Sequence, residues 1–190
     1  MSLERLTFRR GTPDDAAALA RAVAVAFEGY RAWADPGWMP PDAASPAEVA
    51  SLRQRLAAPG TWSELAFDGA VLAGHVMVEP ARAFRGSADV VRGLAHVAHV
   101  FVDERWWGTG LAPRLLGAAV DEIRARGYRA ARLWTPAGQR RARAFYRREG
   151  WEETGQETFD DGLGLAIVEL RLELPDAKSS EDAASAPAEG

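Results

Sequence analysis

Apolar and polar residues alternate with two different periods along the chain, and the periods predict a mixed order of strands and helices. Apolar runs of strand type occupy residues 3–9, 62–67, 71–78, 96–102, 130–134, 151–159 and 163–174. Apolar residues at helical spacing occupy residues 16–30, 46–58, 111–126 and 139–149. The predicted order is therefore β-α-α-β-β-β-α-β-α-β-β, a single α/β domain with a mixed sheet.

Turn and cap residues place the boundaries of these elements. Thr12-Pro13-Asp14-Asp15 and Ser45-Pro46-Ala47-Glu48 each combine an N-cap with a proline at the first helical position, and Ser45 with Glu48 forms a capping-box pattern. Asp68-Gly69 predicts a hairpin turn, and the polar segment 79–92 predicts a loop. Residues 31–41 also read as a loop, in which two tryptophans and a methionine either cover the core or line an acceptor pocket.

The composition limits the classes of protein that fit. The chain has 190 residues, of which 47% are hydrophobic, and a net charge of −4. These values fit one domain with its own core in residues 1–174 and argue against nucleic-acid binding, which needs a basic face. Residues 175–190 form an acidic tail, rich in Ala, Ser, Glu and Asp, that we expect to be disordered.

The absence of certain residues and segments narrows the function further. No cysteine is present, which excludes disulfides, thiolate metal sites and cysteine nucleophiles. The three histidines have no spacing typical of a metal site, so we expect no metal. Neither a signal-peptide pattern nor a long uncharged apolar run occurs, and we therefore expect a cytoplasmic protein that does not enter a membrane.

The segment 94–151 carries the most specific signal. An apolar strand, His96 to Val102, leads through Asp103-Glu104 into Arg105-Trp106-Trp107-Gly108-Thr109-Gly110, and an amphipathic helix begins at about Leu111. The first N–H groups of a helix lack intrahelical partners, and the helix dipole adds positive charge there. Glycines allow a ligand to approach the backbone closely. A strand, glycine turn and helix therefore predict that residues 105–111 bind a phosphate group.

The glycine spacing separates this turn from two common phosphate loops. No Lys-Ser/Thr follows the glycines, as a Walker motif requires, and Pro113 stands where a dinucleotide fingerprint has its third glycine. The remaining R-x-x-G-x-G pattern, preceded by Val100-Phe101-Val102, resembles the acetyl-CoA pyrophosphate loop of the GNAT superfamily of N-acetyltransferases. The segment 139–151 resembles a second motif of that family, with Ala142, Phe145, Tyr146 and Gly150 as matches, Gln139 in place of Asn and Trp151 in place of Phe.

The resemblance implies a binding site for acetyl-CoA as the acyl donor. The backbone of residues 105–111 would hold the pyrophosphate, and the main chains of Val100 and Val102 would bind the pantetheine arm beside a strand splayed from its neighbour. Gln139 stands where the family's Asn contacts that arm. Trp107 occupies a position that is usually Arg, so Arg105 or Arg143 is expected to replace the lost cation. The cofactor-binding residues expected in this way are Val100, Phe101, Val102, Arg105, Trp106, Trp107, Gly108, Thr109, Gly110, Leu111, Gln139 and Tyr146.

The resemblance also implies direct acetyl transfer to a primary amine of a small molecule or peptide in a ternary complex. Tyr146 would protonate the departing thiolate, or else is a core tyrosine. His96 lies six residues before Val102, where several family members have a Glu base, and a histidine titrates near neutral pH. His99 is expected on the opposite face of the strand. Glu64, Glu79 or a chain of waters are alternatives for the base.

Other interpretations remain open at this stage. The arginines of residues 140–148 are expected mainly to face solvent, with contact to the 3′-phosphate of CoA as the alternative. The hairpin of residues 163–174 leaves open pairing across a homodimer. A non-catalytic acyl-CoA-binding module and an unrelated phosphate-binding domain are the two rivals to the enzyme.

Overall fold

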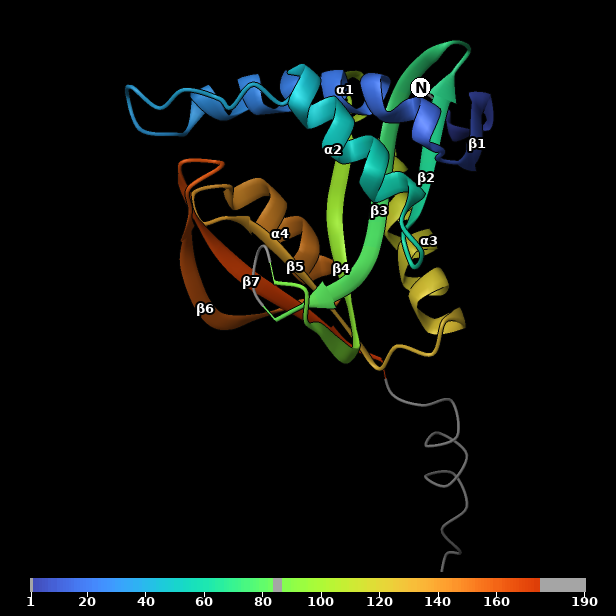
Figure 1. Cartoon of the computed structure of the whole chain (residues 1–190). Helices are drawn as coiled ribbons and strands as arrows, with labels where there is room; N and C mark the ends of the chain where they lie inside the picture. The colour runs from blue at the N-terminus through green and yellow to red at the C-terminus, as the bar shows by residue number, and fades with distance from the viewer. Residues whose placement is uncertain (1, 84–86, 175–190) are drawn as a thin grey trace, which may run out of the picture.

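The computed structural model describes residues 2–83 and 87–174, and the predicted tail lies outside the described residues. The strands are β1 (Leu6–Arg10), β2 (Trp62–Asp68), β3 (Val71–Arg82), β4 (Val90–Val102), β5 (Ala130–Pro136), β6 (Glu152–Asp160) and β7 (Leu165–Glu173). The α-helices are α1 (Ala16–Glu28), α2 (Pro46–Ala57), α3 (Leu111–Ala125) and α4 (Arg140–Arg148). The predicted mixed α/β order is confirmed, and Figure 1 shows one sheet with helices on both faces.

The strands form one seven-stranded sheet in the order β1-β2-β3-β4-β5-β7-β6. Only β4 and β5 pair in parallel; the other neighbours are antiparallel. β7 lies between β5 and β6, so the strand of the hairpin for which pairing across a dimer was left open has a neighbour on each side within the sheet. β6 is the edge, and its exposed residues include several glutamates, which discourage strand addition.

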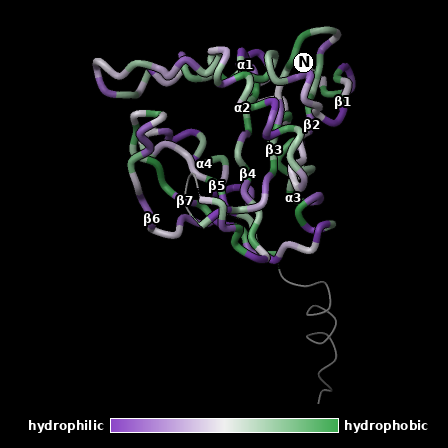
Figure 2. Tube along the Cα trace, viewed as in Figure 1, coloured by the Kyte–Doolittle hydropathy of each residue, from purple (hydrophilic) through white to green (hydrophobic). Residues whose placement is uncertain are grey.

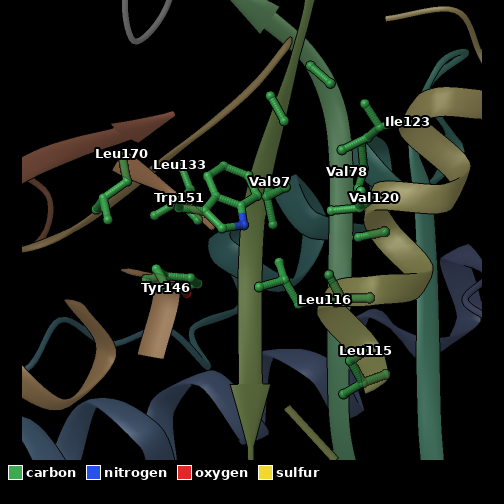
Figure 3. Packing of buried hydrophobic residues seen from close by; sticks show 14 of the residues in the cluster. Val78, Val97, Leu115, Leu116, Val120, Ile123, Leu133, Tyr146, Trp151 and Leu170 are labelled. Atoms are coloured by element: carbon green, nitrogen blue, oxygen red, sulfur yellow. The ribbon is translucent and has the colours of Figure 1, made fainter. Parts of the chain in front are cut away.

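Each face of the sheet has its own hydrophobic cluster. On one face, α1 and α2 contribute Ala16, Leu19 and Leu52, which pack against Leu65 and Met77 of the sheet. On the other face, α3 packs its apolar stripe against β3 and β4, and α4 adds Tyr146 to the same cluster. Figure 3 shows Tyr146 and Trp151 on the β5 side of this cluster and the α3 leucines on the β3 side. The two-sided hydropathy of α3 is visible in Figure 2.

The predicted loop at residues 79–92 is the main error in element placement. β3 continues to Arg82 and β4 begins at Val90, so the two strands are longer than the alternation suggested. The reason is a small third cluster, in which the fully buried Ala81 packs with Leu94 of β4 and Ala130 of β5. Long-range packing thus extends a segment whose own sequence is too polar and glycine-rich to signal a strand.

The chain before the first helix also differs in detail from the prediction. A short 3-10 turn, Leu3–Arg5, occupies the start of the predicted first strand, and a second, Pro13–Asp15, precedes α1. The Thr12 backbone N–H donates to Asp15 Oδ2 at 2.9 Å, so the cap lies on the turn rather than on α1 itself. At α2, Ser45 Oγ accepts the Glu48 N–H at 3.3 Å, as its cap pattern predicted.

β4 and β5 pair over only three residues, in the middle of β4 and at the beginning of β5. The register joins Leu94, Ala95 and His96 to Ala130, Ala131 and Arg132, and no later residues of the two strands are partners. Beyond His96 the strands therefore diverge, as their ribbons do in Figure 1, and we refer to this unpaired part of the sheet as the opening between β4 and β5. Two buried strands that separate within one sheet leave main-chain groups without ladder partners.

A β-bulge in β4 changes which side chains share a face. Met77 of β3 faces His99, whereas the next residue, Val78, faces Val97, so Ala98 is the extra residue. Because a bulge shifts the two-residue alternation by one, His96 and His99 lie on the same face, the one covered by α1 and α2. The expectation that His99 points to the opposite face is therefore wrong.

The bulge brings two histidines together across strands. His75 of β3 is fully buried, and its Nε2 lies 3.4 Å from Nδ1 of His99. Both rings pack against Phe101, with ring centroids 5.6 and 5.8 Å away. Burial lowers the pKa of His75 to about 3 and holds the pKa of His99 well below its usual value. Both imidazoles are therefore neutral at pH 7.

Replacement of Gly74 should reveal how closely β3 approaches β4 and α3. An added Cβ would lie 2.9 Å from the Phe101 carbonyl oxygen and 3.1 Å from Leu115 Cδ1. Because a backbone oxygen cannot move aside cheaply, Gly74→Ala should lower the free energy of unfolding by about 1–3 kcal/mol. Gly117→Ala in the exposed middle of α3, where a Cβ meets nothing within 4 Å, should raise it by about 0.5–1 kcal/mol. Urea denaturation of both variants measures these changes, and equal effects would contradict the packing.

Acid should destabilise the protein through the buried histidines. An unfolded histidine binds a proton near pH 6.5, whereas folded His75 does so only near pH 3, so the free energy of unfolding should fall as the pH drops from 6.5. The loss at pH 5 should be about 2 kcal/mol for His75. Asp15, whose pKa the Arg9 side chain lowers to about 2, titrates below this window. Urea denaturation at pH 7.5 and 5 should show a smaller loss for His75→Leu; an unchanged loss would disprove the assignment.

Candidate functional site

The opening between β4 and β5 presents main-chain groups of β4. The Asp103 N–H donates to the Ala73 carbonyl at 2.9 Å, which fixes the antiparallel alternation between β3 and β4. In that alternation Val102 and Val100 direct their N–H and C=O groups away from β3. Those groups face the opening, because β5 no longer pairs with β4 there. This edge is able to accept an extended ligand arm as an added strand.

One of these groups is already bonded within the chain. The indole Nε1 of Trp107 donates to the Val102 carbonyl at 2.9 Å. The indole therefore lies beside the end of β4, on the side that faces the opening. We expected Val102 to bind the pantetheine arm through its main chain, and its carbonyl has this intramolecular partner instead.

The glycine turn has the geometry that an anion site requires. A short 3-10 turn, Glu104–Trp106, is capped by Asp103, whose Oδ1 accepts the Arg105 N–H at 3.0 Å. Gly108 and Gly110 have φ values of 76° and 92°, a left-handed conformation that favours glycine. A Cβ at Gly108 would meet nothing within 4 Å, so the turn is open there. The predicted start of α3 at Leu111 is confirmed, and its unpaired N–H groups lie directly after this turn.

Two residues expected to bind the cofactor have side chains that point away from the turn. Trp106 is 2% exposed and Leu111 is fully buried, and both belong to the cluster beneath α3. Thr109 Oγ1 donates to the Trp106 carbonyl at 2.7 Å and so closes the turn internally. Only the main chains of Trp106 and Leu111 are therefore able to contact a ligand.

The two arginines expected to replace a lost cation are both held by carboxylates. Arg105 donates through Nε and Nη2 to Asp103 at 2.8 and 3.0 Å. Arg143 donates to Glu153 at 2.8 and 2.7 Å and to the Ala137 carbonyl at 2.7 Å. These contacts hold the pKa of Asp103 and of Glu153 below its usual range.

Tyr146 of α4 is buried near the opening rather than exposed to solvent. It is 8% exposed, and its ring lies 6.3 Å from the Trp151 ring. Burial raises its pKa well above the usual value, and the neighbouring Tyr30 raises it further. Tyr146 therefore keeps its proton at neutral pH, as a general acid must before it acts.

Tyr30 lies in a short 3-10 turn, Gly29–Ala32, directly after α1, and it connects this segment to the second motif, a contact that the sequence did not reveal. Its hydroxyl forms a hydrogen bond with the side chain of Gln139, which opposes the effect of burial; together they leave a pKa of about 12. Gln139 itself caps α4, accepting the Arg143 N–H at 3.1 Å through its carbonyl. The longer side chain of Gln139, compared with Asn, is thus used to bind Tyr30.

His96 lies at the point where β4 and β5 separate. Its Nδ1 is 3.3 Å from the Arg132 carbonyl, and because a carbonyl only accepts, Nδ1 carries the proton and Nε2 is left with a free lone pair. Burial and, to a smaller extent, the charge of Arg132 lower the pKa of His96 to about 4, against the opposing effect of Glu79. His96 is thus neutral at pH 7 and able to accept a proton.

The two carboxylates considered as alternative bases are engaged elsewhere. Glu64 accepts from Arg114 at 2.9 Å on the α3 face, the face opposite to His96. It borders a surface hollow between β2 and α3 that lies away from the opening between β4 and β5. Glu79 accepts from Arg55 of α2 twice at 2.9 Å. His96 therefore has fewer competing contacts than either carboxylate.

Aromatic side chains of the loop that follows α1, residues 31–41, contact residues on the β5 side of the sheet. An added Cβ on Gly138, which precedes α4, would lie 2.9 Å from the Trp33 ring, and Trp38 Nε1 donates to the Leu163 carbonyl at 2.8 Å. Tyr30 stacks between them, with ring centroids 4.8 and 6.1 Å away, and Phe27 joins Tyr30 to Phe101. The tryptophans thus anchor the loop, while the row of rings ends at β4 beside His99.

The structure brings together most of the residues that sequence motifs singled out. His96 lies where β4 and β5 separate, and the contact of Trp107 with Arg141 brings the glycine turn to the start of α4, the helix that begins after Gln139 and carries Tyr146. Tyr30 and the Ala98 bulge were missed, because each depends on a pairing between distant segments. Over residues 2–83 and 87–174, no helix has the length and apolarity to cross a bilayer, and no cluster of three or more metal-ligating side chains occurs.

Comparison with known proteins agrees with this geometry. The family described as acetyltransferase (GNAT) domain matches residues 42–173, more than half of the chain. An uncharacterised N-acetyltransferase from Methanocaldococcus jannaschii is 34% identical over 62 residues, which are 33% of this chain and only 27% of that relative.

Solved structures show the same fold at low sequence identity. An acetyltransferase from Salmonella typhimurium, solved with its cofactor acetyl-CoA, has a TM-score of 0.66 at 18% identity and covers 90% of this chain and 95% of its own. A ribosomal-protein-alanine N-acetyltransferase from Brucella melitensis has a TM-score of 0.66 at 22% identity, with 88% and 99% covered. With the splayed strands, the glycine turn and the matched family in agreement, the chain belongs to the GNAT family of acetyltransferases.

Proposed function

We propose that this protein transfers the acetyl group of acetyl-CoA directly to a primary amine of a small molecule or peptide. The observation that carries the proposal is the opening between β4 and β5, which ends at an open glycine turn and the start of α3. Backbone N–H groups at the helix start suit the diphosphate, and the unpaired edge of β4 suits the amide-bearing pantetheine arm. The described residues therefore fit the donor.

Tyr146 is the proposed acid for the departing thiolate. When the thioester bond breaks and the new amide bond forms, the thiolate of CoA needs one proton. The raised pKa of Tyr146 keeps that proton in place until the thiolate appears beside it. Gln139 is the N-cap of α4 and bonds to Tyr30, and these contacts fix the beginning of the helix that carries Tyr146.

His96 is the proposed acceptor of the proton that the amine loses. Its free Nε2 lies at the closed end of the opening, and the Arg132 carbonyl holds the ring in one tautomer. Because its pKa is about 4, His96 passes the proton on rather than storing it. The acceptor amine would approach from the α1 side, along the aromatic row that ends at Phe101.

Calorimetric titration tests the donor site. Acetyl-CoA and CoA should bind with similar affinity, and ATP should bind much more weakly, because it lacks the pantetheine arm that pairs with β4. Release of thiol with a panel of amines then separates an enzyme from a binding module. Binding without thiol release from any amine would support the non-catalytic module, and equal binding of ATP would contradict a donor site that pairs with the pantetheine arm.

Substitution of Tyr146 and His96 tests the chemistry. Tyr146→Phe should lower kcat at least about 100-fold with little change in the KM for acetyl-CoA, because only proton donation is lost. His96→Gln should lower kcat several-fold or more. Tyr128→Phe removes a hydroxyl from a tyrosine at the other end of α3 and should leave kcat unchanged. Turnover within a few-fold of wild type for both Tyr146→Phe and His96→Gln would exclude these assignments.

A further inference from the structure

Trp107 and Arg141 form a contact that joins the two sides of the opening. Trp107 follows β4 in the glycine turn, and Arg141 lies in the first turn of α4, which follows β5. The guanidinium carbon of Arg141 is 4.0 Å from the centre of the Trp107 ring, within the range of a cation–π contact. β4 and β5 have diverged by this point, so the contact spans the mouth of the opening.

The indole is fixed in place and serves as a platform. Its Nε1 donates to the Val102 carbonyl at 2.9 Å, which prevents the ring from turning away. Trp107 is 52% exposed although its neighbour Trp106 is almost fully buried. A large half-exposed ring held by a hydrogen bond is therefore present at the place where the family usually has an arginine.

Arg141 differs from Arg105 and Arg143, the two arginines that were expected to replace the lost cation. Arg141 forms no ion pair with any residue in 2–83 and 87–174. Arg105 and Arg143, in contrast, each donate two hydrogen bonds to a carboxylate. Arg147 also lies 4.0 Å from Glu153. Among the described residues, the guanidinium of Arg141 lies over the Trp107 ring and donates no hydrogen bond to another group, so its N–H donors are available to a ligand.

We propose that Trp107 and Arg141 act as one unit that binds a phosphate group of the CoA donor. Trp107 positions the guanidinium over the mouth of the opening, next to the Gly108 turn, and Arg141 supplies the cation that the position of Trp107 itself no longer provides. A planar guanidinium binds phosphate oxygens through paired hydrogen bonds. This inference rests on the proposed function, since it names a further residue of the donor site.

Calorimetry with acetyl-CoA tests the unit by comparing matched arginine variants. Arg141→Ala should raise the Kd about tenfold, which corresponds to about 1.4 kcal/mol. Arg148→Ala removes the same charge at the far end of α4 and should leave the Kd within about twofold of wild type. Trp107→Ala should raise the Kd as Arg141→Ala does, and the double variant should show no further increase, because the two residues act together.

Steady-state kinetics distinguish binding from a general structural role. Arg141→Ala should raise the KM for acetyl-CoA, with kcat and the KM for the amine unchanged. Arg141→Lys should restore part of the affinity because the charge remains. Circular dichroism should show the same melting temperature for the Arg141 and Arg148 variants.

A donor without the 3′-phosphate shows which phosphate of CoA the Trp107–Arg141 unit binds. Acetyl-dephospho-CoA lacks the 3′-phosphate but keeps the diphosphate. If Arg141→Ala weakens both donors equally, the unit binds the diphosphate; if it weakens only acetyl-CoA, the unit binds the 3′-phosphate. Equal Kd values for Arg141→Ala and Arg148→Ala, or tighter binding by Arg141→Ala, would overturn the inference. Failure of the wild type to bind acetyl-CoA would overturn the proposed function as well.

Discussion

The separation of β4 from β5 is the constraint on which the rest of the structure depends. A sheet normally pairs all of its buried main-chain groups, and here the pairing ends after His96 and Arg132. The cost of unpaired main chain is tolerated because one hydrophobic cluster, on the α3 face, holds the two halves of the sheet: α3 packs against β3 and β4, and Tyr146 with Trp151 packs against β5 and β7. The opening is therefore supported by the core and does not depend on a mobile loop.

The bulge at Ala98 determines which side chains face the acceptor side of this opening. Without an extra residue, His96 and His99 would lie on opposite faces of β4. With it, both face α1 and α2, and His99 pairs with the buried His75. The same shift directs Val97 and Val100 toward α3, where they pack with its leucines. The one extra residue thus places the histidines of β4 on one face of the sheet and the valines on the other face, in the hydrophobic core beneath the donor site.

Contacts across the opening join segments that are distant in sequence. Tyr30, in the turn after α1, binds Gln139, Trp38 binds the turn between β6 and β7, and Trp107 makes a cation–π contact with Arg141. Each contact links the half of the sheet that contains β4 to the half that contains β5, where main-chain pairing is missing. They stabilise the geometry of the site through side chains, which a bound ligand is able to rearrange more readily than a β-ladder.

The sequence by itself determined the order of the elements, the caps, the glycine turn before α3 and the positions of Gln139 and Tyr146. These features depend on local rules, such as the period of apolar residues and the positive φ at Gly108 and Gly110. The same local rules explain why Leu111 was identified as the start of α3.

Only the tertiary structure decided the extent of β3 and β4, the face of His99, the burial of Trp106 and the partners of Arg105, Arg143 and Trp107. Residues far away in the chain set each of these features. The end of β3 packs against Ala130, and the bulge in β4 depends on its register with Met77. Whether an arginine binds a carboxylate or an aromatic ring depends on which of them the fold places beside it. Local pattern carries no information on such pairings, because their energy comes from neighbours that only the completed sheet brings into contact.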